Sequence, residues 1–242
     1  MRLDKYLSDR NAGTRKEIRE AVRAGRVAVD GVTAADPGMQ LKGGETVSFD
    51  GRALDNAAHV YYMMHKPAGV VTAVRDARLR TVIDLMGADA RKDLFPVGRL
   101  DLDTTGLLLL TNDGAFDHAL MSPKRHVPKT YEALVSGQVE TALINTFAAG
   151  VDLGDFRALP AALEILSSGE TSEVRLTIHE GKFHQVKRMF LAAGHEVLRL
   201  KRIRIGNLPL DETLEEGAYR PLREEEIALL LQGDPEGSPK RG

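Results

Sequence analysis

The stretch GRLDLDTTGLLLLTNDG, residues 98–114, puts three charged side chains directly before four consecutive leucines. The charged residues are Arg99, Asp101 and Asp103. The leucines predict a buried strand, so a carboxylate would stand on a loop at the mouth of an apolar element. Burial on one side and a nearby cation would fix such a carboxylate in place. We therefore predict a single catalytic carboxylate on this loop.

Two other chemistries for the same loop fit less well. Gly106 falls at the sixth position of a calcium loop that starts at Asp101, but the twelfth is Asn112 and positions seven to ten are leucine. A calcium loop needs oxygen ligands there, which excludes it. The aspartate nucleophile of a haloacid-dehalogenase-like phosphatase should follow an apolar strand, whereas here the strand comes after it. A phosphatase remains a distant alternative.

Metal catalysis is not expected either. The chain has no cysteine, which excludes thiol nucleophiles and Cys-ligated metal sites. His179 and His184, in the stretch HEGKFH, are five residues apart, about 140° around a helix, so they cannot share a zinc ion on one face. No glycine-rich phosphate loop is present, and we expect no cofactor.

Positive charge is concentrated near the C-terminal end of the chain. The whole chain has a net charge of −2, but residues 179–205 hold seven lysines and arginines against two glutamates, a net charge of +5. Such a local basic stripe is typical of a nucleic-acid-binding surface. A solvated surface is the alternative explanation and is about as common.

The elements that must position these residues follow from periodicity. Thr14 and Glu17 form a capping box that predicts a helix to Gly25, with arginines along one face. The stretch FHQVKRMFLAAG predicts a helix before Gly194, and VLRLKRIRIG predicts a strand with a bulge at 201–202. Short alternating strands with helices between them indicate an α+β fold with a mainly antiparallel mixed sheet flanked by helices.

Composition changes along the chain predict its domains. Residues 1–50 read as a small unit of helices and hairpins, and the polar residues 51–58 as a linker. Residues 59–232 form a larger domain, and residues 233–242 a disordered tail. The N-terminus has no apolar segment of a signal peptide, and no apolar run reaches the ~18 residues of a membrane span. We expect a cytoplasmic monomer that contacts no membrane.

Four motifs together resemble those of the RsuA-type pseudouridine synthases. In order they are KPAG, GRLDLDTTGLLLLTNDG, KTYEA and EGKFHQVKRMF, and the similarity extends over about residues 1–231. Residues 1–50 resemble the S-four-type RNA-binding domain of those enzymes. The resemblance implies a catalytic domain that isomerises uridine to pseudouridine without metal or cofactor.

The resemblance also assigns roles. Asp101 matches the catalytic nucleophile, and it could attack C1′, attack C6 or drive a glycal route. Tyr131 matches the tyrosine that stacks on the base, Lys187 the cation that pairs with the aspartate, and Arg99 the arginine that helps flip the nucleotide. The expected RNA contacts are Arg15, Arg19, Arg23, Lys66, Lys182, His184, Gln185, Arg188, Arg199, Lys201 and Arg202.

The implied substrate is ribosomal RNA. The stretch EGKFHQVKRMF is closer to the enzymes that modify small-subunit (16S) RNA, so the expected partner is that RNA or the assembling small subunit. A synthase for large-subunit RNA and a non-catalytic RNA-binding assembly factor on the same scaffold are the alternatives. The joint presence of Asp101, Tyr131 and Lys187 argues against the latter, because binding alone needs none of them.

Overall fold

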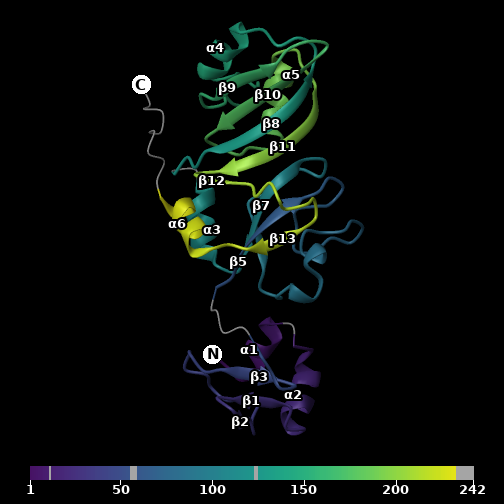
Figure 1. Cartoon of the computed structure of the whole chain (residues 1–242), viewed down its shortest axis with the longest axis vertical. Coiled ribbons are helices and arrows are strands. Elements are labelled where there is room, and N and C mark those ends of the chain that lie inside the picture. The colour runs from purple at the N-terminus through teal and green to yellow at the C-terminus, as the bar shows by residue number, and fades with distance from the viewer. Residues whose placement is uncertain (11, 55–58, 123–124, 233–242) are drawn as a thin grey trace.

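The computed structural model describes residues 1–10, 12–54, 59–122 and 125–232, and these form two sheets with separate cores (Figure 1). The smaller sheet lies in the N-terminal part of the chain and the larger one in the rest. Lys92 of the larger part contacts the smaller one, because its Nζ donates a hydrogen bond to the carbonyl of Gly13 at 3.1 Å.

The N-terminal part packs two helices on a four-stranded antiparallel sheet of order β2-β1-β3-β4. The predicted capping box is present: Thr14 Oγ1 accepts from the Glu17 amide, and Glu17 accepts from the Thr14 amide at 2.6 Å. The apolar faces of both helices are buried in one cluster. The elements are α1 (Leu3–Asp9), α2 (Arg15–Arg23), β1 (Val27–Val29), β2 (Val32–Thr33), β3 (Val47–Phe49) and β4 (Arg52–Ala53).

The start of the expected linker 51–58 belongs to the small sheet. β4 pairs with β3, and Leu54 packs against the N-terminal core. The turn Asp50-Gly51 has positive φ at both residues, so the chain reverses there and forms a hairpin where its composition suggested a linker. Residues 55–58 and the expected disordered tail 233–242 lie outside the described residues.

The larger sheet is mixed and mainly antiparallel, as predicted. Its strand order is β13-β5-β7-β11-β8-β10-β9, with β6 on β7 and β12 on β11, and β7–β11 is the parallel pair. The strands are β5 (Tyr61–Lys66), β6 (Phe95–Val97), β7 (Thr105–Thr111), β8 (Lys129–Ser136), β9 (Ala162–Ser167), β10 (Thr171–Ile178), β11 (Val197–Ile205), β12 (Leu208–Pro209) and β13 (Tyr219–Pro221). The helices are the 3₁₀ helix η1 (Asp84–Asp89), α3 (Gly114–Met121), α4 (Ala142–Ala148), α5 (Gln185–Ala192) and α6 (Glu224–Leu231).

The four leucines form the buried strand β7 because both faces of the sheet are covered. Leu108 and Leu110 enter the core that also holds side chains of α4 and α5, while Leu107 and Leu109 enter the core under α3 and α6. A strand buried on both faces reads as a continuous apolar run. β7 is therefore a rigid support for the loop that precedes it.

The β7–β11 ladder has two residue pairs, 201–105 and 202–106, and requires a glycine. A Cβ on Gly106, whose φ is +105°, would lie 2.2 Å from the carbonyl oxygen of Arg202. The guanidinium of Arg202 then crosses between the strands and donates to the carbonyl of Leu107 at 2.8 Å. The bulge predicted at 201–202 lies slightly later, because β11 shifts register against β8 between Arg202 and Arg204, and again between Val197 and Arg199.

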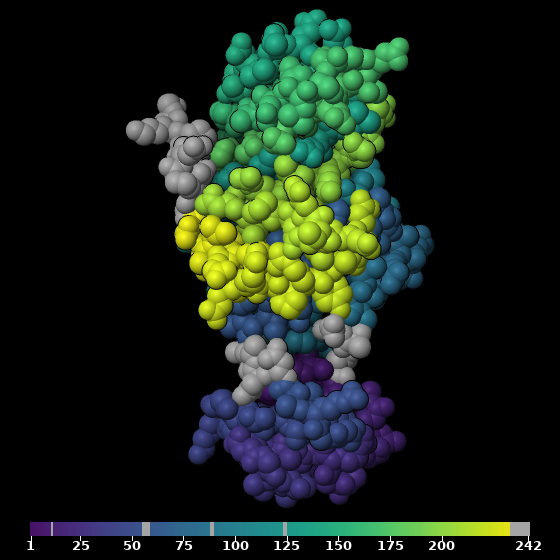
Figure 2. Space-filling model, viewed as in Figure 1, coloured from purple at the N-terminus to yellow at the C-terminus, as the bar shows by residue number. Residues whose placement is uncertain are grey.

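The C-terminal segment, residues 210–232, covers one face of the large sheet. Figure 2 shows it in yellow across the middle of the molecule, and it contributes β13 and the unpredicted helix α6. Among the described residues, no helix is long and apolar enough to cross a membrane.

Candidate active site

A buried lysine holds the loop between β6 and β7. Lys66, the last residue of β5, is 0% exposed, and its Nζ lies 3.0 Å from the carbonyl oxygens of Asp101 and Thr104. It also lies 3.0 Å from the carbonyl of Pro67 and 3.4 Å from that of Leu102. The prediction that Lys66 contacts RNA is therefore wrong, because its ammonium group is enclosed by backbone oxygens and cannot reach a phosphate.

Burial changes the acidity of this lysine. It lowers the pKa of Lys66 to about 8, although the charges of Asp103, Asp101 and Glu216 favour the ammonium form. At neutral pH Lys66 is therefore a cation, paired with carbonyl dipoles instead of a direct carboxylate contact. The backbone of the aspartate loop supplies most of those dipoles.

A second contact fixes the other end of the same loop. Thr72 Oγ1 donates to the carbonyl of Leu100 at 2.8 Å and accepts from the Leu100 amide at 3.2 Å. The amide of Gly69 donates to the carbonyl of Leu102 at 2.8 Å. The residue between them, Asp101, is thus held from both sides through its neighbours' backbone.

Lys187 on α5 reaches both aspartates of the loop. Its Nζ lies 3.5 Å from Asp101 Oδ2 and 2.6 Å from Asp103 Oδ1. The hydrogen bond from Lys187 lowers the pKa of Asp103. Asp103 is 71% exposed, whereas Asp101 is 28% exposed, so the two carboxylates differ in environment although they share one cation.

His184, predicted as an RNA contact, lies beside the same carboxylate. Its Nε2 is 3.6 Å from Asp101 Oδ1, and its backbone has φ 50° and ψ 29°, the left-handed region. Lys187 and His184 therefore approach opposite oxygens of Asp101 from one end of α5. The main feature of the site is therefore that each oxygen of the Asp101 carboxylate faces a different side chain of this helix end.

Tyr131 is in register, across the strands of the large sheet, with the residues at the start of the leucine strand β7. Across neighbouring strands, Lys66 pairs with Gly106, Gly106 with Arg202, and Arg202 with Tyr131. The tyrosine ring is 7% exposed and packs in the core that includes Leu176, its partner on β10. Backbone pairing across these strands thus connects Lys66, which binds the aspartate loop, to Tyr131.

Arg99 lies two residues before the candidate nucleophile and is exposed. No hydrogen bond or ion pair joins its side chain to another residue of the described chain. Its guanidinium is therefore available for an external group close to Asp101.

The other predicted RNA contacts differ widely in exposure. The arginines at 15, 19 and 23 are exposed along α2, as expected. Arg202 and Gln185 are 2% and 3% exposed, so the expectation that they contact RNA is wrong: Arg202 fills the β7–β11 seam, and Gln185 binds Glu180 and the Lys182 amide.

The remaining cations keep partial access. Arg188 pairs with Asp155 and binds the Leu153 carbonyl, and Lys182 lies 4.1 Å from the ring centroid of Phe156. Arg199, 69% exposed, lies 3.5 Å from Glu173. Lys201 is half-buried on β11.

Sequence reasoning missed a basic loop beside the site. Residues 74–80 are exposed and carry Arg75, Arg78 and Arg80. Thr72, two residues before this loop, is bonded to Leu100, so the arginines lie close in the chain to a direct contact of the aspartate loop. The signal was available as three arginines in the run VRDARLR, which follows KPAG.

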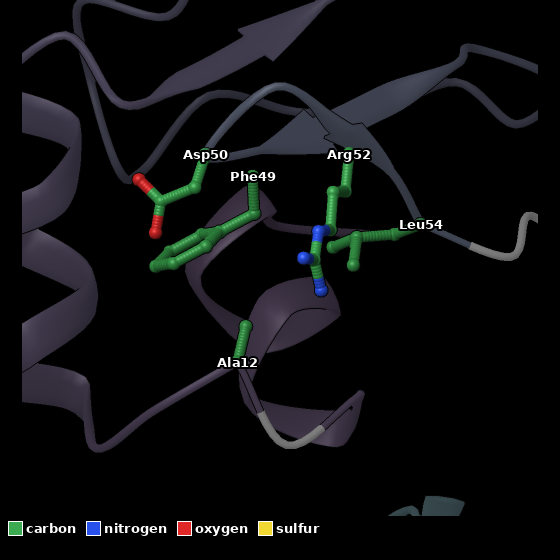
Figure 3. A pocket seen from close by; sticks show the side chains of 5 residues that line it. All are labelled: Ala12, Phe49, Asp50, Arg52 and Leu54. Atoms are coloured by element: carbon green, nitrogen blue, oxygen red, sulfur yellow. The ribbon is translucent and has the colours of Figure 1, made fainter.

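A hollow on the surface lies away from these groups. It has a volume of about 450 Å³, lies on the N-terminal part of the chain and is lined by Ala12, Phe49, Asp50, Arg52 and Leu54 (Figure 3). None of the candidate catalytic residues borders it. The Asp101 carboxylate, which is 28% exposed, lies outside this hollow.

Comparisons with known proteins agree with this arrangement. The RNA pseudouridylate synthase family model matches residues 60–192, and the S4 domain model matches residues 1–47. The chain is 46% identical to the uncharacterized RNA pseudouridine synthase YtzG of Bacillus subtilis, covering 95% of this chain and 98% of that protein. It is 45% identical to the ribosomal small subunit pseudouridine synthase A of Vibrio cholerae, covering 95% and 99%. A crystal structure of a pseudouridylate synthase, 38% identical, superposes with a TM-score of 0.68 over 95% of this chain and 99% of the other.

Proposed function

The chain belongs to the RNA pseudouridylate synthase family, and on this premise we propose that it converts a uridine of small-subunit ribosomal RNA to pseudouridine, with Asp101 as nucleophile. The name of the Vibrio cholerae relative, which is similar over nearly its whole length, supports the choice of RNA. The observation that carries the assignment of the nucleophile is the Asp101 carboxylate, held between Lys187 and His184 on a loop gripped by Lys66.

The reaction needs few groups. The bond between N1 of the base and C1′ of the ribose breaks, C5 bonds to the same C1′, and the proton on C5 is removed while N1 gains one. One well-placed carboxylate near the ribose and base is the main requirement. Held from both sides by backbone contacts, Asp101 is pre-oriented for such a step.

Lys187 has two functions in this proposal. Its positive charge, 3.5 Å from Asp101, attracts and directs one carboxylate oxygen of the nucleophile. Its closer contact with Asp103 holds the lysine side chain over the loop when the site is empty of RNA. Asp103 is then an anchor for Lys187, and Asp101 is the reacting group.

Tyr131 supplies the ring against which the target base stacks. Its burial gives a rigid apolar face, and its hydroxyl has no hydrogen-bond partner in the described part of the chain. A hydroxyl free of protein partners can help to remove the C5 proton. Arg99 then occupies the space left in the RNA by the extruded nucleotide.

Extruding a stacked base costs a few kcal/mol, which phosphate contacts must offset. The exposed arginines of α2 and of the 74–80 loop provide such contacts at two places. The N-terminal part, which matches the S4 domain, therefore adds affinity and the catalytic part adds the chemistry.

Release of tritium from uridine labelled at C5 tests this function. Labelled small-subunit RNA, assembled small subunits and labelled large-subunit RNA are each incubated with the full-length protein. We expect release from the small-subunit substrates, and mapping of the product should give one or a few uridines. Release from large-subunit RNA alone would refute the RNA assignment, and no release from any substrate would favour a non-catalytic assembly factor.

A further inference from the structure

The most exposed aromatic ring of the described chain lies next to the candidate active site. Phe183 is 76% exposed and stacks on His184, with ring centroids 3.8 Å apart and an interplanar angle of 18°. His184 Nε2 is 3.6 Å from Asp101 Oδ1. One face of the phenylalanine therefore covers the histidine, and the other is open to solvent beside the nucleophile.

The turn that presents Phe183 is fixed by partly buried hydrogen bonds. The Lys182 amide donates to Gln185 Oε1 at 3.0 Å, and Gln185 Nε2 donates to Glu180 Oε1 at 2.8 Å. The same glutamate oxygen accepts from the Leu159 amide at 2.8 Å. Phe183 is thus held at the tip of a turn anchored at both ends.

The backbone next to the ring is in an unfavourable conformation. His184 has φ 50° and ψ 29°, in the left-handed region, which is unfavourable for a non-glycine residue. Exposing a large apolar ring also costs free energy, because burial of such a ring would remove its surface from water. Both costs fall on adjacent residues, one of which, His184, contacts the candidate nucleophile, and such strain is concentrated at functional sites.

From this we propose that the Phe183–His184 pair is a stacking platform for an unpaired RNA base next to the target uridine. The proposal rests on the proposed function. Extruding the uridine removes stacking from its neighbours, and an exposed aromatic face can replace it. Phe183 would then favour target sites where a base next to the uridine is unpaired and accessible. It would not distinguish which base stands there, because every base has a face that stacks.

A double-mutant cycle between protein and RNA tests the platform. The probe is an RNA oligonucleotide spanning the uridine that the wild-type protein modifies, together with two copies that carry an abasic nucleotide directly 5′ or directly 3′ of it. The variants are Phe183→Ala, Phe183→Trp, which keeps a stacking face, and Leu166→Ala. Leu166 is a matched control because it is an exposed apolar residue on β9. This strand forms one edge of the large sheet, and three strands, β11, β8 and β10, separate it from β7.

On intact RNA, Phe183→Ala should lower kcat/KM about tenfold, which corresponds to about 1.4 kcal/mol. Phe183→Trp and Leu166→Ala should stay within about twofold of the wild type. On one of the two abasic RNAs, the wild type should itself be slower and Phe183→Ala should cause no further loss.

Two outcomes would overturn the platform. An unchanged kcat/KM for Phe183→Ala on intact RNA means that the ring binds no base. A tenfold loss that persists on both abasic RNAs means that Phe183 acts through His184 on Asp101.

The proposed function fails in a different way. If no ribosomal RNA is modified, the platform is tested by affinity for a ten-nucleotide oligouridylate. Wild-type protein should then bind it about tenfold more tightly than Phe183→Ala does, and equal affinities would refute the platform.

Discussion

The ammonium group of Lys66 lies 3.0 Å from the carbonyl oxygen of Asp101 and is fully buried. A cation at the end of one strand thus fixes the backbone of the candidate nucleophile, which precedes the neighbouring strand. The carboxylate itself is left free to face Lys187 and His184.

Replacing Lys66 by methionine should uncouple catalysis from RNA binding. The side chain keeps its length, but the carbonyls of Asp101 and Thr104 lose their donor, at a cost of about 1–3 kcal/mol in the free energy of unfolding. A displacement of Asp101 by about 1 Å should lower kcat about a hundredfold. Single-turnover rates measure the effect on catalysis, RNA affinity the effect on binding, and urea unfolding the effect on stability. A normal kcat in Lys66→Met would show that the hydrogen bonds of Lys66 to the loop are irrelevant to catalysis.

The stability of the protein should rise with pH through the titration of Lys66. The folded pKa is about 8, below the ordinary 10.5, so between these values the unfolded chain binds more protons than the folded one. The free energy of unfolding of the wild type, relative to that of Lys66→Met, should therefore increase between pH 8 and pH 10.5 by up to about 3 kcal/mol. Lys129, whose pKa burial also lowers to about 8, titrates in both proteins and cancels. Urea denaturation at several pH values measures the difference, and a flat or falling difference would contradict the titration.

The two aspartates of the loop should differ sharply when each is changed to asparagine. Asp101→Asn removes the nucleophilic charge and should slow single-turnover pseudouridine formation at least about a thousandfold, with RNA affinity retained. Asp103→Asn removes only the closer partner of Lys187, which can then turn fully to Asp101, so its rate should change less than about fivefold. A larger loss in Asp103→Asn than in Asp101→Asn would reverse the assignment.

Tyr131→Phe should separate stacking from proton transfer. The ring remains in its core position, so RNA affinity should stay within about twofold of the wild type. Loss of the hydroxyl should slow turnover about a hundredfold if it assists removal of the C5 proton. Single-turnover rates measured with and without deuterium at C5 provide the check, and a wild-type rate would leave the hydroxyl no chemical role.

The arginine face of α2 should contribute salt-dependent affinity. Changing Arg15, Arg19 and Arg23 together to glutamine should reduce the slope of log affinity against log salt by up to about 2–3, because each phosphate contact contributes nearly one counterion. Arg26→Gln is the control, since that guanidinium already pairs with Asp50. An unchanged slope in the triple variant would show that these three arginines do not contact RNA phosphates.

Much of the fold was predictable because it depends on local patterns. The Thr14–Glu17 capping box, the helix over 185–192 and the buried leucine strand all follow from spacing within a few residues. The proximity of Lys187 to the loop was predictable only through the family motifs, because the two are 84 residues apart.

The roles of Lys66 and Arg202 were not predictable from composition. Both are cations that sequence reasoning placed on the RNA surface, yet each is buried and binds backbone carbonyls. Their burial depends on how strands distant in the sequence come together. The one local signal for Lys66 is that it ends the apolar run YYMMHK before a proline.

The short β7–β11 ladder divides the catalytic groups between two bodies. Asp101 precedes β7 and is bound through its carbonyl by Lys66 of β5, whereas Tyr131 lies on β8 and Lys187 on α5. In the described sheet, two β7–β11 residue pairs, the Arg202–Leu107 hydrogen bond and the Lys187–Asp103 ion pair join the two bodies. Because these contacts are few, the spacing of the two bodies also depends on the apolar side chains packed above and below the seam. Such packing weakens on cooling and under pressure. Catalytic alignment should therefore be more sensitive to cold and to compression than the secondary structure of either body.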